Sequence, residues 1–421
     1  MQFGSWRFEV CSLKFGVWRC PPGDRLSSPV TAPQKPVRAL FINGGILGLK
    51  TFASFVEQAF VGDCDGVRAS QIVLTSDLTL AERAARRVLC AHFWPGDATT
   101  FRNADLHRFR AEWHAGLLAR RRIRRLERAE GAFDVLHFHR QATAYASLDR
   151  MRRTPSIVSI DCTQRCVIEA ASTPFERATY RPNVVRDGEM FRAAALIVST
   201  SEWAANCLRE EYPDCATPID VLGHPVHLAA FDPAWAHERY LRAGGAADYQ
   251  PRVLFVGGDF ARKGGYDLLE AWTEGQFASR ARLDVVTAHP IDRVPEGVRV
   301  RIGITAHSAE WIAMWRDADV FVLPTRDEAF GLVYQEAAAA GLPVIGTRIN
   351  AVPELVDDGR SGLLVARGAR AELIRALDEL IASRERRLEM GRRGRESVES
   401  TGDPAVYRQQ LVAAILRVAK T

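Results

Sequence analysis

The sequence lacks the patterns that mark three common classes of protein. None of its eight cysteines forms a Cys-x2-Cys pair, so we expect free thiols in a reducing cytosol rather than a structural zinc site. No run reaches the roughly 20 apolar residues of a membrane-spanning helix, and the N-terminus shows no signal-peptide pattern. A net charge of +5 over 421 residues is too small to indicate a nucleic-acid partner by itself. We therefore expect a cytoplasmic protein.

The composition is that of an ordinary globular protein, with 47% hydrophobic and 25% charged residues. A length of 421 residues predicts two domains, each large enough for its own core. Residues 1–36 mix aromatic side chains with glycine and charge and end in a proline-rich stretch, so we expect a poorly ordered extension. An arm that binds a partner is the alternative. Lysine is scarce, which makes Lys263, in a glycine-rich loop, conspicuous.

The stretch from residue 319 to residue 346 predicts a strand, a loop, a helix and a second strand. Asp319–Leu323 is a short apolar run typical of a buried parallel strand. Leu332–Ala340 includes four consecutive alanines, which favour a helix, and the following Gly-Leu-Pro ends it. Val344–Gly346 is the second strand. A helix that begins at the carboxyl end of a parallel strand is a usual site for an anionic nucleotide, because its free N–H groups and dipole favour anions.

Two carboxylates frame the start of this helix. Glu328 lies in the preceding loop and Glu336 lies within the helix. A rise of 1.5 Å per residue would separate them by roughly 12 Å. The paired carboxylates of a retaining glycosidase lie only about 5–5.5 Å apart. Two acids so far apart suit the two ends of one long polar ligand, such as a nucleotide sugar.

The whole ordered set resembles the C-terminal signature of retaining glycosyltransferases of family four, which have the glycosyltransferase-B fold. The matching segments are Glu328-Ala329-Phe330-Gly331, Glu336-Ala337, Gly341-Leu342-Pro343-Val344, Pro353-Glu354 and Gly359-Arg360-Ser361-Gly362. The resemblance implies that Glu328 is a catalytic-site residue that binds the donor sugar and that Glu336 binds the ribose. The donor-binding residues that it implies at the helix start are Phe330, Gly331 and Leu332.

A second glycine-rich loop is similar to the same family and departs from it at one position. A buried strand at Arg252–Val256 leads into Gly257–Gly265, and a helix follows. The family's loop runs Gly-Arg-Leu-x-x-x-Lys-Gly, so Lys263 fits, whereas Gly258 replaces the usual arginine. Arg262 would supply the missing cation. Two cations can neutralise a diphosphate, and each charge-assisted hydrogen bond contributes about 1.5–3 kcal/mol. A surface turn with incidental charges is the alternative.

The first half opens with the same arrangement of strand, glycine-rich turn and helix. The buried strand Arg38–Ile42 precedes Asn43–Gly48, which contains Gly44 and Gly45. In the family the equivalent loop lies under the donor phosphates, so the resemblance implies donor contacts at both glycines. Glycines that only permit a tight turn are the alternative.

Two further strand ends carry candidate residues. The predicted strand Asp134–His139 ends in a histidine that alternation places on the same face as His137, so we expect His139 to be exposed at the strand's carboxyl end. The resemblance implies that His139 reaches the donor sugar and the acceptor and is catalytic; a structural histidine is the alternative. Asp161, after the predicted strand Ser156–Ile160, is the acceptor-binding candidate.

A basic amphipathic helix is predicted over residues 105–128. Arginines at 120, 121, 122, 124, 125 and 128 share it with apolar residues. Such a helix can lie on an anionic membrane surface, as in some family-four enzymes that glycosylate lipids. A solvated arginine face and a nucleic-acid site are the alternatives, although no nucleic-acid motif accompanies the charge.

The predicted fold class is therefore α/β, with two Rossmann-like domains that face a central cleft in the glycosyltransferase-B manner. We expect an acceptor-binding domain over residues 37–230 and a nucleotide-sugar-binding domain over 251–403. Residues 404–421 predict a terminal helix, which in relatives crosses back onto the first domain.

The resemblance implies a retaining hexosyl transfer from a nucleoside diphosphate sugar to an acceptor hydroxyl, in cell-envelope polysaccharide or glycolipid synthesis. We expect no cofactor and no metal, because Asp63-Cys64-Asp65 and Asp317-Ala318-Asp319 precede strands instead of ending them. A nucleotide-sugar 2-epimerase of the same fold and a non-catalytic protein that binds a nucleotide sugar or a membrane surface are the alternatives. Asn350-Ala351 stands where the family usually carries glycines near the donor sugar, so the donor sugar stays open.

Overall fold

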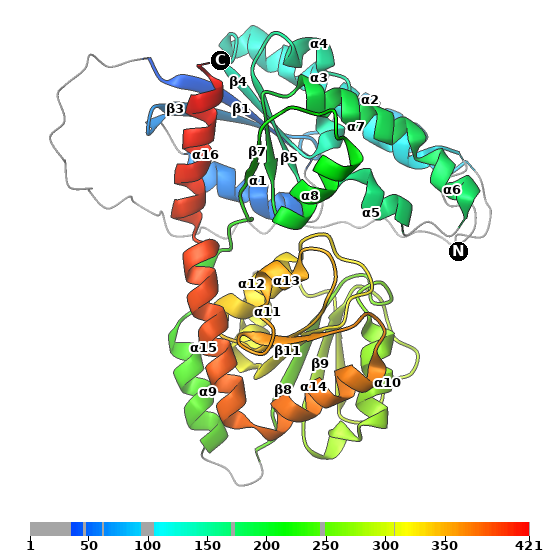
Figure 1. The fold of residues 1–421 in the computed structure, drawn as a ribbon, viewed down its shortest axis with the longest axis vertical. Coiled ribbons are helices and arrows are strands. Elements are labelled where there is room, and N and C mark those ends of the chain that lie inside the picture. The colour runs from blue at the N-terminus through cyan, green and yellow to red at the C-terminus, as the bar shows by residue number, and fades with distance from the viewer. Residues whose placement is uncertain are drawn as a thin grey trace, which may run out of the picture. The chain divides into compact units, whose positions relative to one another are not determined.

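The computed structural model describes residues 35–44, 48–60, 63–93, 105–169, 173–244, 249–306 and 308–420. The predicted extension, apart from its last two residues, and the predicted donor contact at Gly45 lie outside this part of the chain. Two α/β domains follow one another, each built on its own sheet (Figure 1). None of the described helices is long and apolar enough to cross a membrane.

The first domain has a seven-stranded sheet in the order β2-β3-β1-β4-β5-β6-β7. Neighbouring strands pair in parallel, except that β2 is antiparallel to β3. The strands are β1 (Val37–Asn43), β2 (Asp63–Cys64), β3 (Val67–Val73), β4 (Val135–His139), β5 (Ser156–Ile160), β6 (Leu196–Ser199) and β7 (Ile219–Val221). The helices are α1 (Gly48–Ala59), α2 (Leu80–Leu89), α3 (His107–Glu130), α4 (Leu148–Met151), α5 (Gln164–Glu169), α6 (Pro174–Thr179), α7 (Arg181–Ala193) and α8 (Glu202–Glu211).

The second domain has a six-stranded parallel sheet in the order β10-β9-β8-β11-β12-β13. Its strands are β8 (Arg252–Val256), β9 (Arg282–Thr287), β10 (Val298–Ile302), β11 (Val320–Leu323), β12 (Val344–Thr347) and β13 (Gly362–Val365). Its helices are α9 (Ala234–Gly244), α10 (Gly265–Glu274), α11 (Ala309–Asp317), α12 (Leu332–Ala339), α13 (Val352–Leu355), α14 (Arg370–Ala382) and α15 (Arg384–Thr401). The chain then continues into α16 (Pro404–Val418), which packs on the first domain.

Both faces of the first sheet are covered, as a buried parallel sheet requires. Alternate residues of β1 enter two separate cores: Leu40 lies in one and Phe41 in the other. The second of these cores is completed by α16, which packs against α1, β3 and β5 (Figure 1). Tyr407, Leu411 and Ile415 are its fully buried or nearly buried contributions. The last helix of the chain is therefore part of the first domain's core.

The α/β class with two domains is confirmed, and most strands fall where the apolar runs predict them. The sequence pattern, with prolines and glycines over residues 223–250, predicts only a connection between the domains, and this prediction was wrong: the segment contains α9, whose Trp235 lies in the core of the second domain. Helix α7 was also missed, since its first turn contains proline and its arginines and acids obscure the apolar period.

Gly264 sets how closely the loop after β8 approaches the loop after β11. It is the N-cap of α10, with φ +74°, and a Cβ there would overlap the carbonyl group of Pro324. Gly359 has a similar φ of +78° but open space around it. A side chain at Gly264 would therefore meet both an unfavourable φ and a steric clash, whereas a side chain at Gly359 would meet only the unfavourable φ.

We predict that Gly264→Ala lowers the free energy of unfolding by about 2–5 kcal/mol, because left-handed strain and overpacking add. Gly359→Ala should cost only the left-handed share, about 1–2 kcal/mol. Urea denaturation of both variants checks this. Equal losses of unfolding free energy in the two variants would mean that the close approach of the two loops does not contribute to stability.

Candidate functional site

Lys263 and Glu328 meet at the carboxyl edge of the second sheet. They follow β8 and β11, which are neighbours in the sheet. The Lys263 Nζ donates a hydrogen bond to Glu328 Oε2, and the side chains are only 14% and 13% exposed. A largely buried pair needs both partners, because either charge alone would be costly to desolvate. The two residues that the sequence singled out separately thus form one unit.

Arg262 borders this pair and connects the two loops. Its Nη1 donates to the carbonyl oxygen of Asp327 at 2.7 Å, and its Nε donates to Asp259 Oδ2 at 3.3 Å. The side chain keeps 40% of its surface exposed. Arg262 therefore stands beside Lys263 with a guanidinium that a second anion can still reach.

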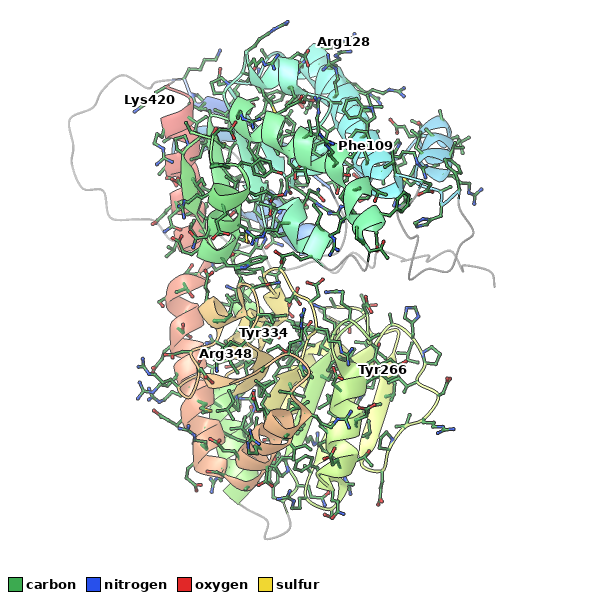
Figure 2. The ribbon with its side chains drawn as sticks, turned by 45° about the vertical axis from the view of Figure 1, so that its right-hand side comes forward. Phe109, Arg128, Tyr266, Tyr334, Arg348 and Lys420 are labelled. Atoms are coloured by element: carbon green, nitrogen blue, oxygen red, sulfur yellow. The ribbon has the colours of Figure 1, made fainter. Side chains whose placement is uncertain are left out.

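The start of α12 lies against the same pair. Gly331, its N-cap, has φ +89°, and a Cβ there would come within 2.7 Å of the Tyr334 ring and 3.1 Å of Glu328 Cγ. No side chain caps the helix, so its first N–H groups have no side-chain acceptor. Tyr334, buried inside the domain (Figure 2), donates its hydroxyl hydrogen to Leu323 O at 2.8 Å and fixes α12 on β11. Phe330 is buried beside this helix start.

Asn350, where the family usually has glycine, contacts the backbone of Glu328. Its backbone takes φ +49°, a conformation that asparagine tolerates better than most residues. Its Nδ2 donates to the carbonyl oxygen of Glu328 at 2.8 Å. Asn350 therefore combines a left-handed backbone with a hydrogen bond that holds the backbone of Glu328.

Glu336 is a carboxyl group without a partner. It lies on α12, partly buried, and within the described residues no hydrogen bond or ion pair reaches its side chain. Burial raises its pKa from 4.5 to about 8. A buried acid with free hydrogen-bonding capacity is suited to ligand hydroxyls.

The first domain contributes His139, but not as an exposed residue. The prediction of exposure was wrong: His139 is 3% exposed, because the Phe52 ring stacks on it with centroids 3.7 Å apart. Burial, aided by the nearby rings of His224 and His137, holds the pKa of His139 well below its usual value. Its Nδ1 has no hydrogen-bond partner in the described part of the chain. His139 is thus a neutral imidazole that orients a ligand more readily than it exchanges protons.

Asn43 is a site residue that the sequence analysis missed. It ends β1 directly opposite His139 in the strand register and is fully buried. Neither polar atom of its side chain has a partner among the described residues. The available signal was a polar residue closing an apolar strand just before Gly44, which is partly exposed at the same edge.

His224 was also missed, and it lies between residues of both domains. It follows β7, and its ring centroid is 5.6 Å from that of His139 and 5.5 Å from that of Phe330. Burial lowers its pKa to about 4, while the carboxylate of Asp161 acts in the opposite direction. No sequence pattern distinguishes this histidine, because it sits in an irregular segment.

Arg140, directly after His139, takes a strained backbone conformation. Its φ is +89°, which is uncommon for a residue with a Cβ. Its Nη2 lies 4.0 Å from Glu112 Oε1, and 36% of the side chain stays exposed. Asp161, exposed after β5, raises the pKa of Arg140 together with Glu112, against the effect of burial. The acceptor-binding candidate Asp161 thus faces a cation that the sequence analysis did not single out.

The predicted site residues therefore fall into two groups. The structure brings Arg262, Lys263, Glu328, Glu336 and the start of α12 to one edge of the second sheet. His139, Gly44 and Asp161 lie at strand ends of the first sheet. Ring contacts of His224 with His139 and with Phe330 connect the two groups.

Glu336 makes the stability of the protein depend on pH. The folded protein binds its proton up to about pH 8, whereas the unfolded chain releases it near 4.5, so folding stability falls as the pH rises across this window. We predict that Glu336→Gln melts at a higher temperature than the unchanged protein, by a margin that grows from pH 5 to pH 8. Thermal melts across this range check it. The exposed Glu57→Gln should show no trend, and a constant margin for Glu336→Gln would refute the assignment.

Comparisons with known proteins show what this chain is similar to. Residues 250–383, which contain Lys263, Glu328 and Glu336, match the family model described as Glycosyl transferases group 1. A D-inositol 3-phosphate glycosyltransferase of Paenarthrobacter aurescens is 27% identical over 312 residues, which cover 66% of this chain and 71% of that protein.

Solved structures agree on the fold. The sucrose-phosphate synthase of Thermosynechococcus elongatus superposes with a TM-score of 0.65 at 16% identity, over 91% of this chain and 99% of that one. The Anabaena protein Alr3699/HepE, solved with UDP and glucose, gives 0.59 at 13% identity, over 90% and 99%.

Proposed function

We propose that this chain, a glycosyltransferase of the family-four type that uses nucleotide-sugar donors, transfers a hexosyl group to an acceptor hydroxyl with retention of configuration. The observation that carries the proposal is the Lys263–Glu328 pair beside the uncapped start of α12. One cation, one carboxylate and a helix N-terminus lie together, and a free carboxyl group lies farther along the same helix. A diphosphate can bind the cation and the helix N-terminus, and the hydroxyls of a sugar and of a ribose can bind the two carboxyl groups.

Each group has a role in this proposal. Lys263, Arg262 and the N–H groups at Gly331 and Leu332 would stabilise the charge that develops on the leaving diphosphate. Glu328 would bind hydroxyls of the donor sugar. Glu336, which keeps its proton up to about pH 8, would donate to or accept from the ribose hydroxyls.

The first domain would supply the acceptor side. His139 and Asn43 both carry buried polar atoms without partners in the described chain, and both lie at the ends of adjacent strands. His139 would orient donor and acceptor as a neutral group, with Gly44 beneath the donor phosphates. The proposed reaction includes no nucleophilic side chain. The acceptor hydroxyl would therefore attack the donor sugar from the same face as the leaving group, assisted by the leaving phosphate. Asp161 would contact the acceptor.

The proposed reaction uses no metal. The carboxylates of Asp317 and Asp319, one of the two D-x-D pairs, bind protein groups instead: Arg252 reaches Asp317 at 3.1 Å, and Tyr249 donates to Asp319 at 2.6 Å. They lie at the amino end of β11, away from the end that carries Glu328.

We infer a cell-envelope polysaccharide or glycolipid acceptor and a cytoplasmic enzyme in peripheral contact with the inner face of the membrane through α3. Two arginines of α3 are not available for that contact: Arg120 pairs with Asp149, and Arg122 donates to Val73 O at 2.7 Å. Arg124, Arg125 and Arg128 are exposed, and no ion pair within the described chain engages them.

Thermal stabilisation by UDP, GDP and ADP, with and without magnesium, tests the donor site. One diphosphate should raise the melting temperature selectively, and magnesium should not be needed. The double variant Arg262→Ala and Lys263→Ala should lose about a hundredfold or more in affinity, because two charge-assisted hydrogen bonds are removed. Arg293→Ala, an exposed cation of the same domain, is the control. If no diphosphate stabilises the protein, the donor site is misassigned.

Glu328→Gln tests the sugar contact with little change of shape. In a transfer assay with the selected donor, we expect kcat/KM to fall about a hundredfold, while stabilisation by the free diphosphate persists. The exposed Glu389→Gln should leave kcat/KM unchanged. Unchanged turnover in Glu328→Gln would exclude the residue from the site, and a product in which an epimerised sugar stays attached to the nucleotide would indicate an epimerase.

A further inference from the structure

A carboxylate of the second domain binds backbone N–H groups of the first domain. Glu354 lies in α13, and its two oxygens accept hydrogen bonds from the N–H groups of Glu202, at 2.9 Å, and Trp203, at 2.7 Å. These are the first two residues of α8. A carboxylate makes strong hydrogen bonds with such donors, and the dipole of a helix favours an anion at this end. We call this interaction the Glu354–α8 contact.

The first domain caps the start of α8 only in part. Ser201, the N-cap, accepts a hydrogen bond from the third N–H group of the helix, that of Ala204, at 3.1 Å. The first two N–H groups have no acceptor within the helix, as at every helix start. Glu354 binds both of them. The contact therefore satisfies two donors that would otherwise bind water.

The Glu354–α8 contact lies outside both domain cores. Glu354 and Glu202 are exposed, and Trp203 is half-buried. If the contact opened, water could solvate the carboxylate and the two N–H groups, so its net contribution to the stability of either domain is small. The contact thus bears on how α8 and α13 lie against each other more than on whether each domain folds.

In the second domain, a short buried turn joins Glu354 to the loop of Glu328. Asn350 begins this turn and donates a hydrogen bond to Glu328 O at 2.8 Å. Ala351 and Val352 are fully buried, and Glu354 N donates to Ala351 O at 3.0 Å. A displacement of the Glu328 backbone is therefore passed through this turn to Glu354.

In the first domain, backbone hydrogen bonds join the start of α8 to the strand end that carries Asp161. Helix α8 follows β6, and Ser199 of β6 lies opposite Ile160 of β5 in the register. Thr200 N donates to Ile160 O at 3.0 Å, and Asp161 is the next residue of the chain. The acceptor candidate and the helix start that binds Glu354 are therefore parts of one hydrogen-bonded edge.

A ring contact near this edge cannot replace the hydrogen bonds of Glu354. A Cβ at Gly223, which follows β7, would lie 3.8 Å from the Phe330 ring and 3.8 Å from Thr200 O. His224 also contacts the Phe330 ring. Apolar contacts of this kind are not directional, whereas a hydrogen bond weakens steeply as its angle falls. Glu354 therefore defines the orientation of α8 against α13 more narrowly than the rings do.

We propose that Glu354 is a positioning residue for the transfer reaction. By binding the start of α8, it holds the strand end of Asp161 in register with Glu328. This role rests on the proposed function, because it relates the acceptor side to the donor side. Glu354 itself touches neither substrate and acts only through the backbone of α8 and of α13.

Glu354→Gln tests the role with little change of size. An amide can accept one of the two hydrogen bonds, but its NH2 group would face the other N–H group. In a transfer assay with the selected donor, we expect kcat/KM to fall about tenfold, the effect of losing one charge-assisted contact. Thermal stabilisation by the nucleoside diphosphate should stay the same. A residue that only supported the fold of the second domain would weaken both together.

Hydrogen exchange of the full chain tests the contact without any substrate. In Glu354→Ala, the amide hydrogens of Glu202 and Trp203 should exchange about tenfold faster than in the unchanged protein, because they lose their acceptor. The amide of Ala204 should keep its rate. Mass spectrometry of peptides that cover the start of α8 measures these rates, and equal rates in the two proteins would overturn the proposal.

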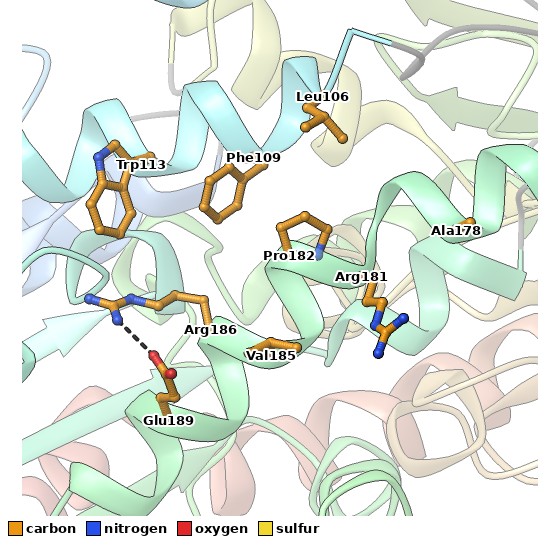
Figure 3. Close-up of a pocket in the computed structure, with 9 residues that line it drawn as sticks. All are labelled: Leu106, Phe109, Trp113, Ala178, Arg181, Pro182, Val185, Arg186 and Glu189. Atoms are coloured by element: carbon orange, nitrogen blue, oxygen red, sulfur yellow. Dashed lines mark hydrogen bonds and ion pairs between the residues drawn. The ribbon is translucent and has the colours of Figure 1, made fainter.

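Two other carboxylates provide matched controls. The Glu372 carboxylate also accepts from a backbone N–H group, that of Ala366 at 2.8 Å, but within the second domain. Glu189 pairs with Arg186 at 2.7 Å in the first domain, beside a hollow of about 510 Å³ between α3 and α7 (Figure 3). Glu372→Gln and Glu189→Gln should each change kcat/KM by less than about twofold. A tenfold loss in either control would overturn the assignment to Glu354.

The remaining outcomes are decisive as well. Unchanged kcat/KM in Glu354→Gln would mean a surface contact only, and a higher kcat/KM in Glu354→Ala would mean that Glu354 blocks the start of α8; either overturns the proposal. The exchange rates do not depend on the donor, so they support or refute the contact even if no nucleoside diphosphate stabilises the protein. Failure of the positioning role and failure of the proposed function are therefore distinguishable.

Discussion

The ion pair between Lys263 and Glu328 is the constraint on which the edge of the second sheet depends. Lys263 can reach Glu328 because Gly264 lets its loop pass close to the carbonyl group at the end of β11. Glu328 holds its place because Gly331 leaves room beside it and Asn350 binds its carbonyl oxygen. Gly264, Gly331 and Asn350, which all have a positive φ, therefore position the Lys263–Glu328 ion pair. A ligand that separates this pair must replace both partners, which favours one with an anion and hydroxyl groups a short distance apart.

The site residues at the strand ends of the two sheets differ in charge. The second domain presents cations, a carboxylate and a helix N-terminus. In the first domain, the rings of His139 and His224 and the amide of Asn43 stay neutral, since burial lowers the pKa values of both histidines, whereas Arg140 and Asp161 at neighbouring strand ends are charged. In the proposed reaction, the neutral histidines would orient the acceptor without attracting the leaving anion.

The sequence predicts best where a pattern is local. Apolar runs located most strands, and the order of glycines and acids from residue 319 onward located Glu328 and Glu336. What it missed depends on distant contacts. Nothing local shows that Phe52 covers His139, or that His224 lies 5.6 Å from it. The arginines of α3 show the same limit, because composition cannot tell Arg122, which binds backbone carbonyls, from its exposed neighbours.

The position of α16 has a consequence for synthesis of the chain. Its Tyr407, Leu411 and Ile415 belong to a core that also contains Phe41 of β1, so the first domain to leave the ribosome lacks one of its own helices until residues 404–418 are made. Domains usually fold in order of synthesis. Here one face of the first sheet stays uncovered until α16 has been made, and the second domain can be complete before the first. Helix α16 and strand β1 thus complete one core, although more than 350 residues separate them in the chain.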